Sequence, residues 1–252
     1  MRLLPICFTL MTLTSTNAWA GWIEFGDQSL PCSGEYDVIN AAELYTATIN
    51  KDGAEKVHFI KTKAEDSTCP SESASCVQEA YLVPGDRVIV SAGSGTLACV
   101  TYVSSKGSSK MGLLPAPRLD FETNFFAKLD SKEMLGTWSS DASEVSLSKG
   151  DSGFITIDGD ATRGPPTYNS GSISGPAFIS SEGMTAGYEE EHYDGEKAAS
   201  DPAELSGGCR VRIRSLTHYL VIDDNDRCGG QGVTFSGIYI KGPLKNREGI
   251  DD

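Results

Sequence analysis

Ser152 is one residue whose sequence surroundings resemble those of a catalytic serine nucleophile. It lies in the run Gly150-Asp151-Ser152-Gly153-Phe154. A serine nucleophile needs a histidine base that a buried acid holds in place, and the candidate base is His58 in Val57-His58-Phe59. The run around Ser152 also separates two segments of alternating hydrophobicity, which is typical of a hairpin turn. The sequence favours the turn, since no serine or cysteine has a base at motif spacing.

A second candidate is the acidic run Asp223-Asp224-Asn225-Asp226. An EF-hand calcium loop places oxygen ligands at alternate positions and a glutamate at the twelfth. Counted from the first aspartate, the fifth position is Arg227 and the twelfth is Thr234, so the spacing does not match. We expect a hairpin loop rich in turn formers, pinned by Cys228. Loosely bound calcium is the alternative.

A third run, Glu189-Glu190-Glu191-His192-Tyr193-Asp194, offers metal-binding groups but no zinc-site spacing. We expect residues 189–208 to form a solvated acidic loop. The chain has 3 histidines, and no two of them are close in sequence. The sequence therefore indicates neither a metal centre nor acid–base catalysis, and we predict a protein that is not an enzyme and has no cofactor.

Three aromatic residues are the candidate ligand-binding residues. Tyr81 and Tyr102 alternate with apolar neighbours in strand-like runs, and Trp22 lies near the start of the expected mature chain. Exposed aromatic side chains on a small β unit could form a groove for a peptide or a glycan. The alternative is that the tyrosines belong to the core.

The first 20 residues have the pattern of a secretory signal. Arg2 precedes an apolar run from Leu3 to Leu13, and Ala18-Trp19-Ala20 is a small-x-small cleavage site. The run is shorter than the about 20 residues that a membrane-spanning helix needs. We expect residues 1–20 to be removed and the product to be periplasmic or secreted, without insertion into a membrane.

The expected mature chain is strongly acidic. The full sequence has 21 Lys and Arg against 35 Asp and Glu, a net charge of −14, and removal of Arg2 with the signal would make it −15. Such a surface repels phosphate backbones and anionic lipids. We therefore expect no nucleic-acid or membrane partner, whereas a cationic protein would be attracted.

Six cysteines remain after the signal, and an even number in an exported chain indicates three disulfides. No Cys-x-x-Cys pair exists and no histidine neighbours a cysteine at ligand spacing, so disulfides are favoured over zinc. The expected pairs are Cys69–Cys76, which flank a short loop, Cys209–Cys228, which flank an apparent hairpin, and the remaining Cys32–Cys99.

Glycine and proline separate short runs rich in Val, Ile, Thr and Tyr, which predicts an all-β, disulfide-stapled protein. Its length suits two modest domains better than one. The expected division is a first unit over 21–119, a linker or short helix over 120–133, an antiparallel β unit over 134–241 and a flexible polar tail over 242–252.

The first unit resembles bacterial SH3-like domains over residues 80–119. The resemblance rests on Glu79-Ala80-Tyr81-Leu82-Val83-Pro84-Gly85-Asp86-Arg87-Val88, on Leu97-Ala98-Cys99-Val100-Thr101-Tyr102-Val103 and on Gly112-Leu113-Leu114-Pro115. In that family a Gly-Trp-Leu-Pro strand usually closes the barrel, and here Leu113 replaces the tryptophan that often lines the ligand groove. The resemblance implies a small barrel that recognises cell-wall peptides or proteins.

The second unit opens with Met134-Leu135-Gly136-Thr137-Trp138, which resembles the first strand of lipocalin-like barrels. Strict alternation marks Phe154–Asp158 and Cys209–Arg214, where one face would be buried and the other wet. Seven strand-like runs over 134–241 predict an antiparallel β-barrel or sandwich.

Together these features predict an exported binding protein of the bacterial cell envelope, whose SH3-like unit recognises a cell-wall peptide or a secreted or periplasmic protein. The alternative is a periplasmic inhibitor or immunity protein against a basic, lysozyme-like cell-wall hydrolase, because an acidic surface speeds encounter with a cationic enzyme. A deep aromatic groove on the first unit would favour the first function. A protruding loop would favour the second.

Overall fold

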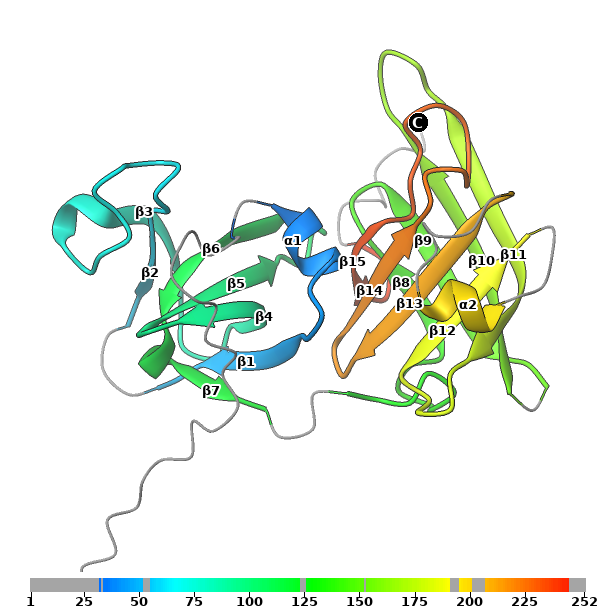
Figure 1. The fold of residues 1–252 in the computed structure, drawn as a ribbon, viewed down its shortest axis with the longest axis horizontal. Helices are drawn as coiled ribbons and strands as arrows, with labels where there is room; N and C mark the ends of the chain where they lie inside the picture. Colours follow the sequence, from blue (N-terminus) through cyan, green and yellow to red (C-terminus); the bar gives the residue numbers. More distant parts are fainter. Residues whose placement is uncertain are drawn as a thin grey trace, which may run out of the picture.

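Strands make up almost all of the regular structure in the computed structural model, which describes residues 32, 34–51, 55–122, 126–151, 153–190, 195–200 and 207–244. One curled seven-stranded sheet is followed by a closed eight-stranded barrel (Figure 1). The all-β prediction is confirmed. The predicted signal, Trp22 and the run 191–194 lie outside the described residues.

The first sheet follows the short helix α1 (Glu35–Ile39). Its strands are β1 (Tyr45–Ile49), β2 (Val57–Ile60), β3 (Val77–Leu82), β4 (Arg87–Ser94), β5 (Leu97–Val103), β6 (Ser109–Pro115) and β7 (Leu119–Phe121). Their order across the sheet is β3-β2-β6-β5-β4-β1-β7, so β3 and β7 are its edges. The sheet curls as a small barrel would, but its two edges do not pair with each other.

A hydrophobic cluster from alternate residues of the strands fills one face of this sheet. It contains Ala47, Ile49, Val57, Phe59, Leu82, Val88, Val90, Ala98, Val100, Leu114, Ala116 and Leu119. On the opposite face Ile60, Ala92 and Leu113 are covered by a cluster of four cysteines. Both faces are therefore apolar near the middle of the sheet, as the continuous apolar runs of its strands require.

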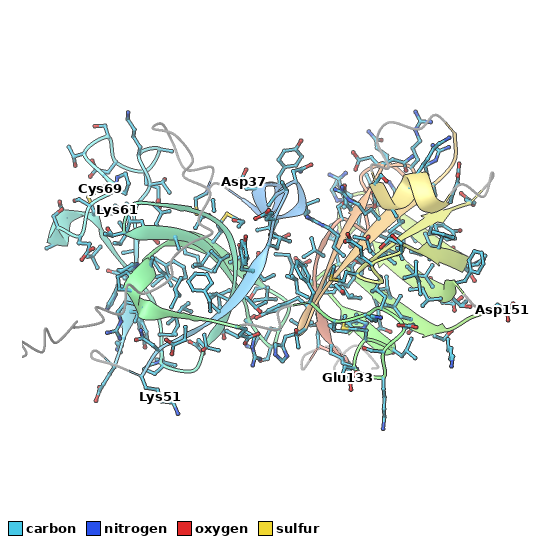
Figure 2. The ribbon with its side chains drawn as sticks, turned by 60° about the horizontal axis from the view of Figure 1, so that its bottom comes forward. Asp37, Lys51, Lys61, Cys69, Glu133 and Asp151 are labelled. Atoms are coloured by element: carbon cyan, nitrogen blue, oxygen red, sulfur yellow. A yellow bond between two sulfur atoms is a disulfide. The ribbon has the colours of Figure 1, made fainter. Side chains whose placement is uncertain are left out.

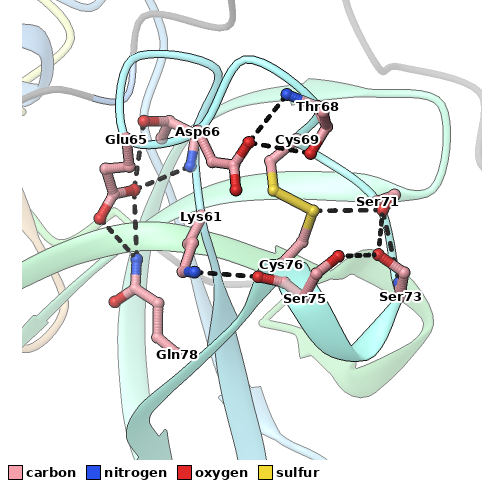
Figure 3. The surroundings of a disulfide bond; sticks show 11 residues. Lys61, Glu65, Asp66, Thr68, Cys69, Ser71, Ser73, Ser75, Cys76 and Gln78 are labelled. Atoms are coloured by element: carbon pink, nitrogen blue, oxygen red, sulfur yellow. Dashed lines mark hydrogen bonds between the residues drawn. A yellow bond between two sulfur atoms is a disulfide. The ribbon is translucent and has the colours of Figure 1, made fainter.

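Three disulfides join Cys32 to Cys99, Cys69 to Cys76 and Cys209 to Cys228, the pairs that the sequence predicts. The Cys69–Cys76 bond closes a lobe between β2 and β3, immediately before the strand of Tyr81 (Figure 3). In this lobe the Lys61 ammonium donates to the Ser75 carbonyl at 2.9 Å. These bonds fix the approach of the chain to β3.

The barrel consists of β8 (Gly136–Ser139), β9 (Ser143–Lys149), β10 (Phe154–Thr162), β11 (Ser170–Ile179), β12 (Thr185–Glu189), β13 (Arg210–Leu216), β14 (Tyr219–Asp224) and β15 (Gly237–Lys241). Every neighbouring pair is antiparallel, and β15 pairs with β8 to close it. Side chains fill the interior, with Trp138, Phe235 and Tyr239 fully buried. The Trp138 indole donates to the Met134 carbonyl at 2.8 Å.

The barrel differs from the sequence expectation at two places. The run 210–222 contains two strands instead of one, because the chain turns at Thr217-His218 without glycine or proline. Residues 195–200, expected within a surface loop, form helix α2 (Gly195–Ser200), with Ala198 buried against the barrel. A Cβ at Gly187 would lie 1.9 Å from the Gly195 carbonyl oxygen, so only glycine lets α2 approach β12.

The segment 120–133, expected as a linker, belongs partly to each sheet. Strand β7 occupies its start and pairs with β1. Leu129 is fully buried in the core cluster of the barrel, together with Met134. Leu129 and Met134 therefore pack into the barrel core although both precede its first strand, β8.

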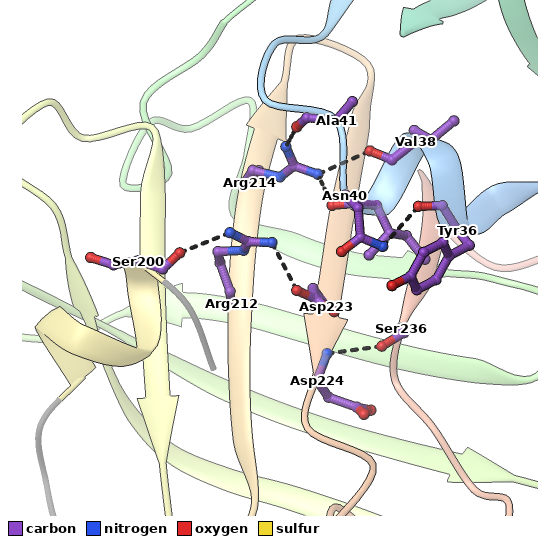
Figure 4. Close-up of polar contacts among 11 residues, drawn as sticks. Tyr36, Val38, Asn40, Ala41, Ser200, Arg212, Arg214, Asp223, Asp224 and Ser236 are labelled. Carbon is purple, nitrogen blue, oxygen red and sulfur yellow. Dashed lines mark hydrogen bonds and ion pairs between the residues drawn. The ribbon is translucent and has the colours of Figure 1, made fainter. Parts of the chain in front are cut away.

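The two sheets share a hydrophobic seam. Val38, Ile39, Leu44, Ile89 and Val103 of the first unit form one buried cluster with Leu216, Tyr219, Val221 and Ile238 of the barrel. Arg214 crosses the seam and donates to the carbonyls of Val38, Ile39 and Ala41 at 3.1, 2.5 and 2.7 Å (Figure 4). These include the carbonyls at the end of α1, which have no partner within the helix.

The face of β13 that was expected to be exposed to solvent therefore makes most of its contacts within the protein. Burial lowers the pKa of Arg214 to about 10, so its guanidinium stays protonated at neutral pH. Arg212 bridges the Asp223 carboxylate and the Ser200 carbonyl, both at 2.8 Å. The arginines of β13 therefore connect the barrel to α1 and α2.

Candidate functional site

Tyr81 and Tyr102 lie on opposite faces of the first sheet. In β3 the neighbours Ala80 and Leu82 pack with the core cluster, so Tyr81 points to the other face and is 43% exposed. Tyr102 packs against that same core cluster, and burial raises its pKa. Two strands, β2 and β6, separate their strands. The two tyrosines therefore do not line one groove, and Tyr102 is a core residue.

Tyr81 instead belongs to a stripe of exposed residues along β3, which is mostly apolar but includes the charged Glu79. Val77, Tyr81 and Val83 are 39%, 43% and 42% exposed. They are separated by even numbers of residues, as expected for side chains on one face of an extended segment. The Lys56 ammonium lies 4.1 Å from the centroid of the Tyr81 ring, and the His58 ring, opposite on β2, lies 5.5 Å from it. We call Val77, Tyr81, Val83, Lys56 and His58 the β3 surface.

The backbone of β3 adds to this surface. In the described part of the sheet, β2 is the single neighbour of β3. One side of β3 therefore presents backbone N–H and C=O groups that no other strand of the sheet uses. Such an edge can accept an added strand, while alternate side chains supply the specificity.

A second candidate is the loop between β10 and β11, residues 163–169, which rises beyond the end of the barrel (Figure 1). Tyr168 is 74% exposed and has a φ of 48°, a left-handed conformation that is uncommon for tyrosine. The Asn169 amide donates to the Gln231 carbonyl at 2.7 Å, and the Gly230 N–H donates to Ser170. These bonds tie the loop to the segment that Cys228 pins.

The motifs with possible chemistry have structural roles. The chain turns as predicted between the end of β9 at Lys149 and the start of β10 at Phe154, on a different sheet from His58, and the Phe154 N–H donates to the Asp151 carbonyl at 2.9 Å. Ser152 itself lies outside the described residues. Asp224 accepts bonds from the backbone N–H of Asp226 and Phe235 and from the Thr234 hydroxyl. Burial nevertheless raises its pKa. In the described ranges, no three His, Cys, Asp or Glu residues gather to hold a metal.

A polar cluster lies beside the seam between the two sheets. Glu122 accepts from Arg87 at 2.8 Å and from Thr46 at 2.7 Å, and His218 lies 3.8 Å away. Desolvation raises the pKa of Glu122, but these partners outweigh it, so the pKa is lowered. Burial and the nearby Arg87 lower the pKa of His218. The carboxylate is thus held ionised by Arg87 and Thr46 of the first unit, which gives it a structural role.

The β3 surface and the 163–169 loop are therefore both exposed features that could receive a partner. No helix of the described part is both long and apolar enough to cross a membrane. No protein-family model, curated protein or solved structure matches this chain.

Proposed function

We propose that this chain is an exported, non-enzymatic binding protein of the bacterial cell envelope, which takes up an extended peptide along β3. The observation that carries the proposal is the β3 surface, an open strand edge with three exposed apolar side chains. The signal-like start and the three disulfides support export to an oxidising compartment. The resemblance of residues 80–119 to SH3-like domains supports a cell-wall peptide or protein as the ligand.

Binding at this edge would use two kinds of contact. The added peptide would pair with the free backbone groups of β3, which supplies affinity without regard to sequence. Its alternate side chains would lie on Val77, Tyr81 and Val83, because successive side chains of a strand point to opposite faces. Lys56, already stacked on Tyr81, would add a cation at one end of the stripe.

Tyr81→Ala should weaken retention on purified peptidoglycan by about tenfold, because exposed aromatic anchors dominate such interfaces. Co-sedimentation of the full mature protein with peptidoglycan measures this. The matched control is Tyr36→Ala, which removes a tyrosine that is 75% exposed on α1. Equal retention of the Tyr81 variant and the wild type, or no retention of the wild type, would contradict the proposal.

A second candidate function, inhibition of a basic cell-wall hydrolase, is favoured by the protruding 163–169 loop. Tyr168 could enter a cleft of the enzyme, and the net charge of −14 would attract a cationic partner. We expect inhibition of a basic lysozyme that weakens as salt is added and falls by about tenfold in Tyr168→Ala. Unchanged lysozyme activity at low ionic strength would remove this function.

A further inference from the structure

The barrel carries a hollow that neither the β3 surface nor the 163–169 loop includes. Its lining comes from the β9–β10 turn and from β10 and β11, namely Lys149, Gly150, Asp151, Phe154, Thr156 and Pro176. We call it the β9–β11 hollow. It is open to solvent rather than enclosed, with a volume of about 500 Å³. Figure 2 shows Asp151 at the end of the molecule far from the first sheet.

Phe154 forms the aromatic part of the hollow. Its neighbour Ile155 and the next inward residue, Ile157, are fully buried in the barrel, so Phe154 points outward. Phe154 lies opposite Phe178 on β11, and the two rings meet edge to face with centroids 5.8 Å apart. This contact holds the Phe154 ring in place beside the hollow.

Three polar side chains surround this ring. Lys149 and Asp151 are exposed, and Thr156 is partly exposed. Among the residues that the structure describes, none of these three side chains has a hydrogen bond or ion pair. Together they offer an ammonium donor, a carboxylate acceptor and a hydroxyl that both donates and accepts.

We propose that the β9–β11 hollow binds a neutral glycan. A pyranose ring has an apolar C–H face, which can pack on Phe154, and hydroxyl groups at its rim, which can bond to Lys149, Asp151 and Thr156. A purely apolar ligand would desolvate the charged groups without replacing their bonds. The Asp151 carboxylate would repel an anion, and the Lys149 ammonium would repel a cation, so a neutral ligand fits best.

The surroundings of the hollow indicate a chain of sugars rather than one ring. On the outward face, Ser148 lies opposite Thr156, and Ser146 lies opposite Asp158 in the next row. Ser174 on β11 donates to Asp158 at 2.6 Å. Successive outward residues of a strand are roughly 6.6–6.8 Å apart. Hydroxyl and carboxylate groups thus continue from the hollow along the sheet.

The test is a titration of the full, isotope-labelled mature protein with the β-1,4-linked tetrasaccharide of N-acetylglucosamine, followed by NMR. We expect resonances of Phe154 and Thr156 to shift, and Phe154→Ala to weaken binding by about tenfold. Asp151→Asn changes an exposed residue, so it keeps the fold and should also weaken binding. Tyr36→Ala, which removes an aromatic side chain that is 75% exposed on α1, should leave binding unchanged.

Two results would overturn the proposal. One is an absence of shifts around the hollow at millimolar tetrasaccharide, and the other is equal binding by the wild type, Phe154→Ala and Asp151→Asn. In the first case, a shift at Phe154 with a tripeptide would assign the hollow to another ligand. This test is independent of the peptidoglycan test of the β3 surface. Tyr81→Ala leaves the hollow intact, so it should not change tetrasaccharide binding.

Discussion

Glu189→Ala should lower the free energy of unfolding by about 3–5 kcal/mol. Arg210 donates to one oxygen of Glu189 through Nε and Nη2, at 2.9 and 2.5 Å. The two side chains are only 5% and 2% exposed. Removal of the carboxylate would take two hydrogen bonds and an ion-pair partner from a guanidinium that is buried beside the Cys209–Cys228 bond, and breaking such a pair costs more than the pair contributes.

Denaturant unfolding followed by circular dichroism measures this loss. Asp160→Ala is the matched control, because it removes an exposed carboxylate from the same barrel and should change stability by less than about 0.5 kcal/mol. A double variant, Glu189→Leu with Arg210→Met, should recover most of the stability, since an apolar pair needs no counter-charge. A loss below about 1 kcal/mol in Glu189→Ala would contradict this account of the pair.

Replacing both Cys32 and Cys99 by alanine should cost about 4 kcal/mol, because that bond closes a loop with a sequence separation of 67. The same change at Cys69 and Cys76, with a separation of 7, should cost only about 2 kcal/mol. All four sulfurs belong to one buried cluster, so the comparison separates loop length from packing.

Denaturant unfolding of the two double variants, without reductant, gives both losses. The expected order follows from the larger number of conformations that a long cross-linked loop removes from the unfolded chain. A greater loss for the short loop than for the long one would show that native-state packing, rather than loop closure, determines the contribution of these bonds.

Local patterns were sufficient to predict much of the fold. Pro84-Gly85-Asp86 forms a turn of the kind that proline and glycine favour, with Gly85 at a φ of 94°, and the Val83 N–H donates to the Asp86 carboxylate. The alternation at Phe154–Asp158 matches its burial, with Ile155 and Ile157 inside. The Cys69–Cys76 and Cys209–Cys228 pairs each flank a local loop, so the two remaining cysteines, Cys32 and Cys99, had to form the third pair. Each of these depends on residues that are near one another in sequence.

The parts that sequence could not predict depend on distant residues. Nothing around Arg214 indicates that its partners are carbonyls of α1, more than 170 residues earlier. Helix α2 is short, and its position depends on the absence of a side chain at Gly187. The turn at Thr217-His218 has none of the residues that usually mark turns.

The candidate sites show the same limit. Alternation places the Tyr81 side chain on one face of β3 and those of Ala80 and Leu82 on the other. Because residues on both faces are apolar, the sequence does not reveal which face packs on the core. The β9–β11 hollow combines a turn residue, Asp151, with Phe154 and with Pro176 from the next strand. Strand register brings Pro176 opposite Thr156, and register was not available from the sequence.

The seam has a consequence for how long polymers would be held. Strand β3 (Figure 1) and Asp151 of the β9–β11 hollow (Figure 2) lie at opposite ends of the molecule, and the buried cluster around Ile39 and Tyr219 with Arg214 fixes their spacing. A cell-wall polymer that reaches both sites would behave as a bivalent ligand, because the first contact raises the effective concentration for the second. Short fragments would then dissociate quickly, and affinity would rise sharply once chain length matches the span of the protein.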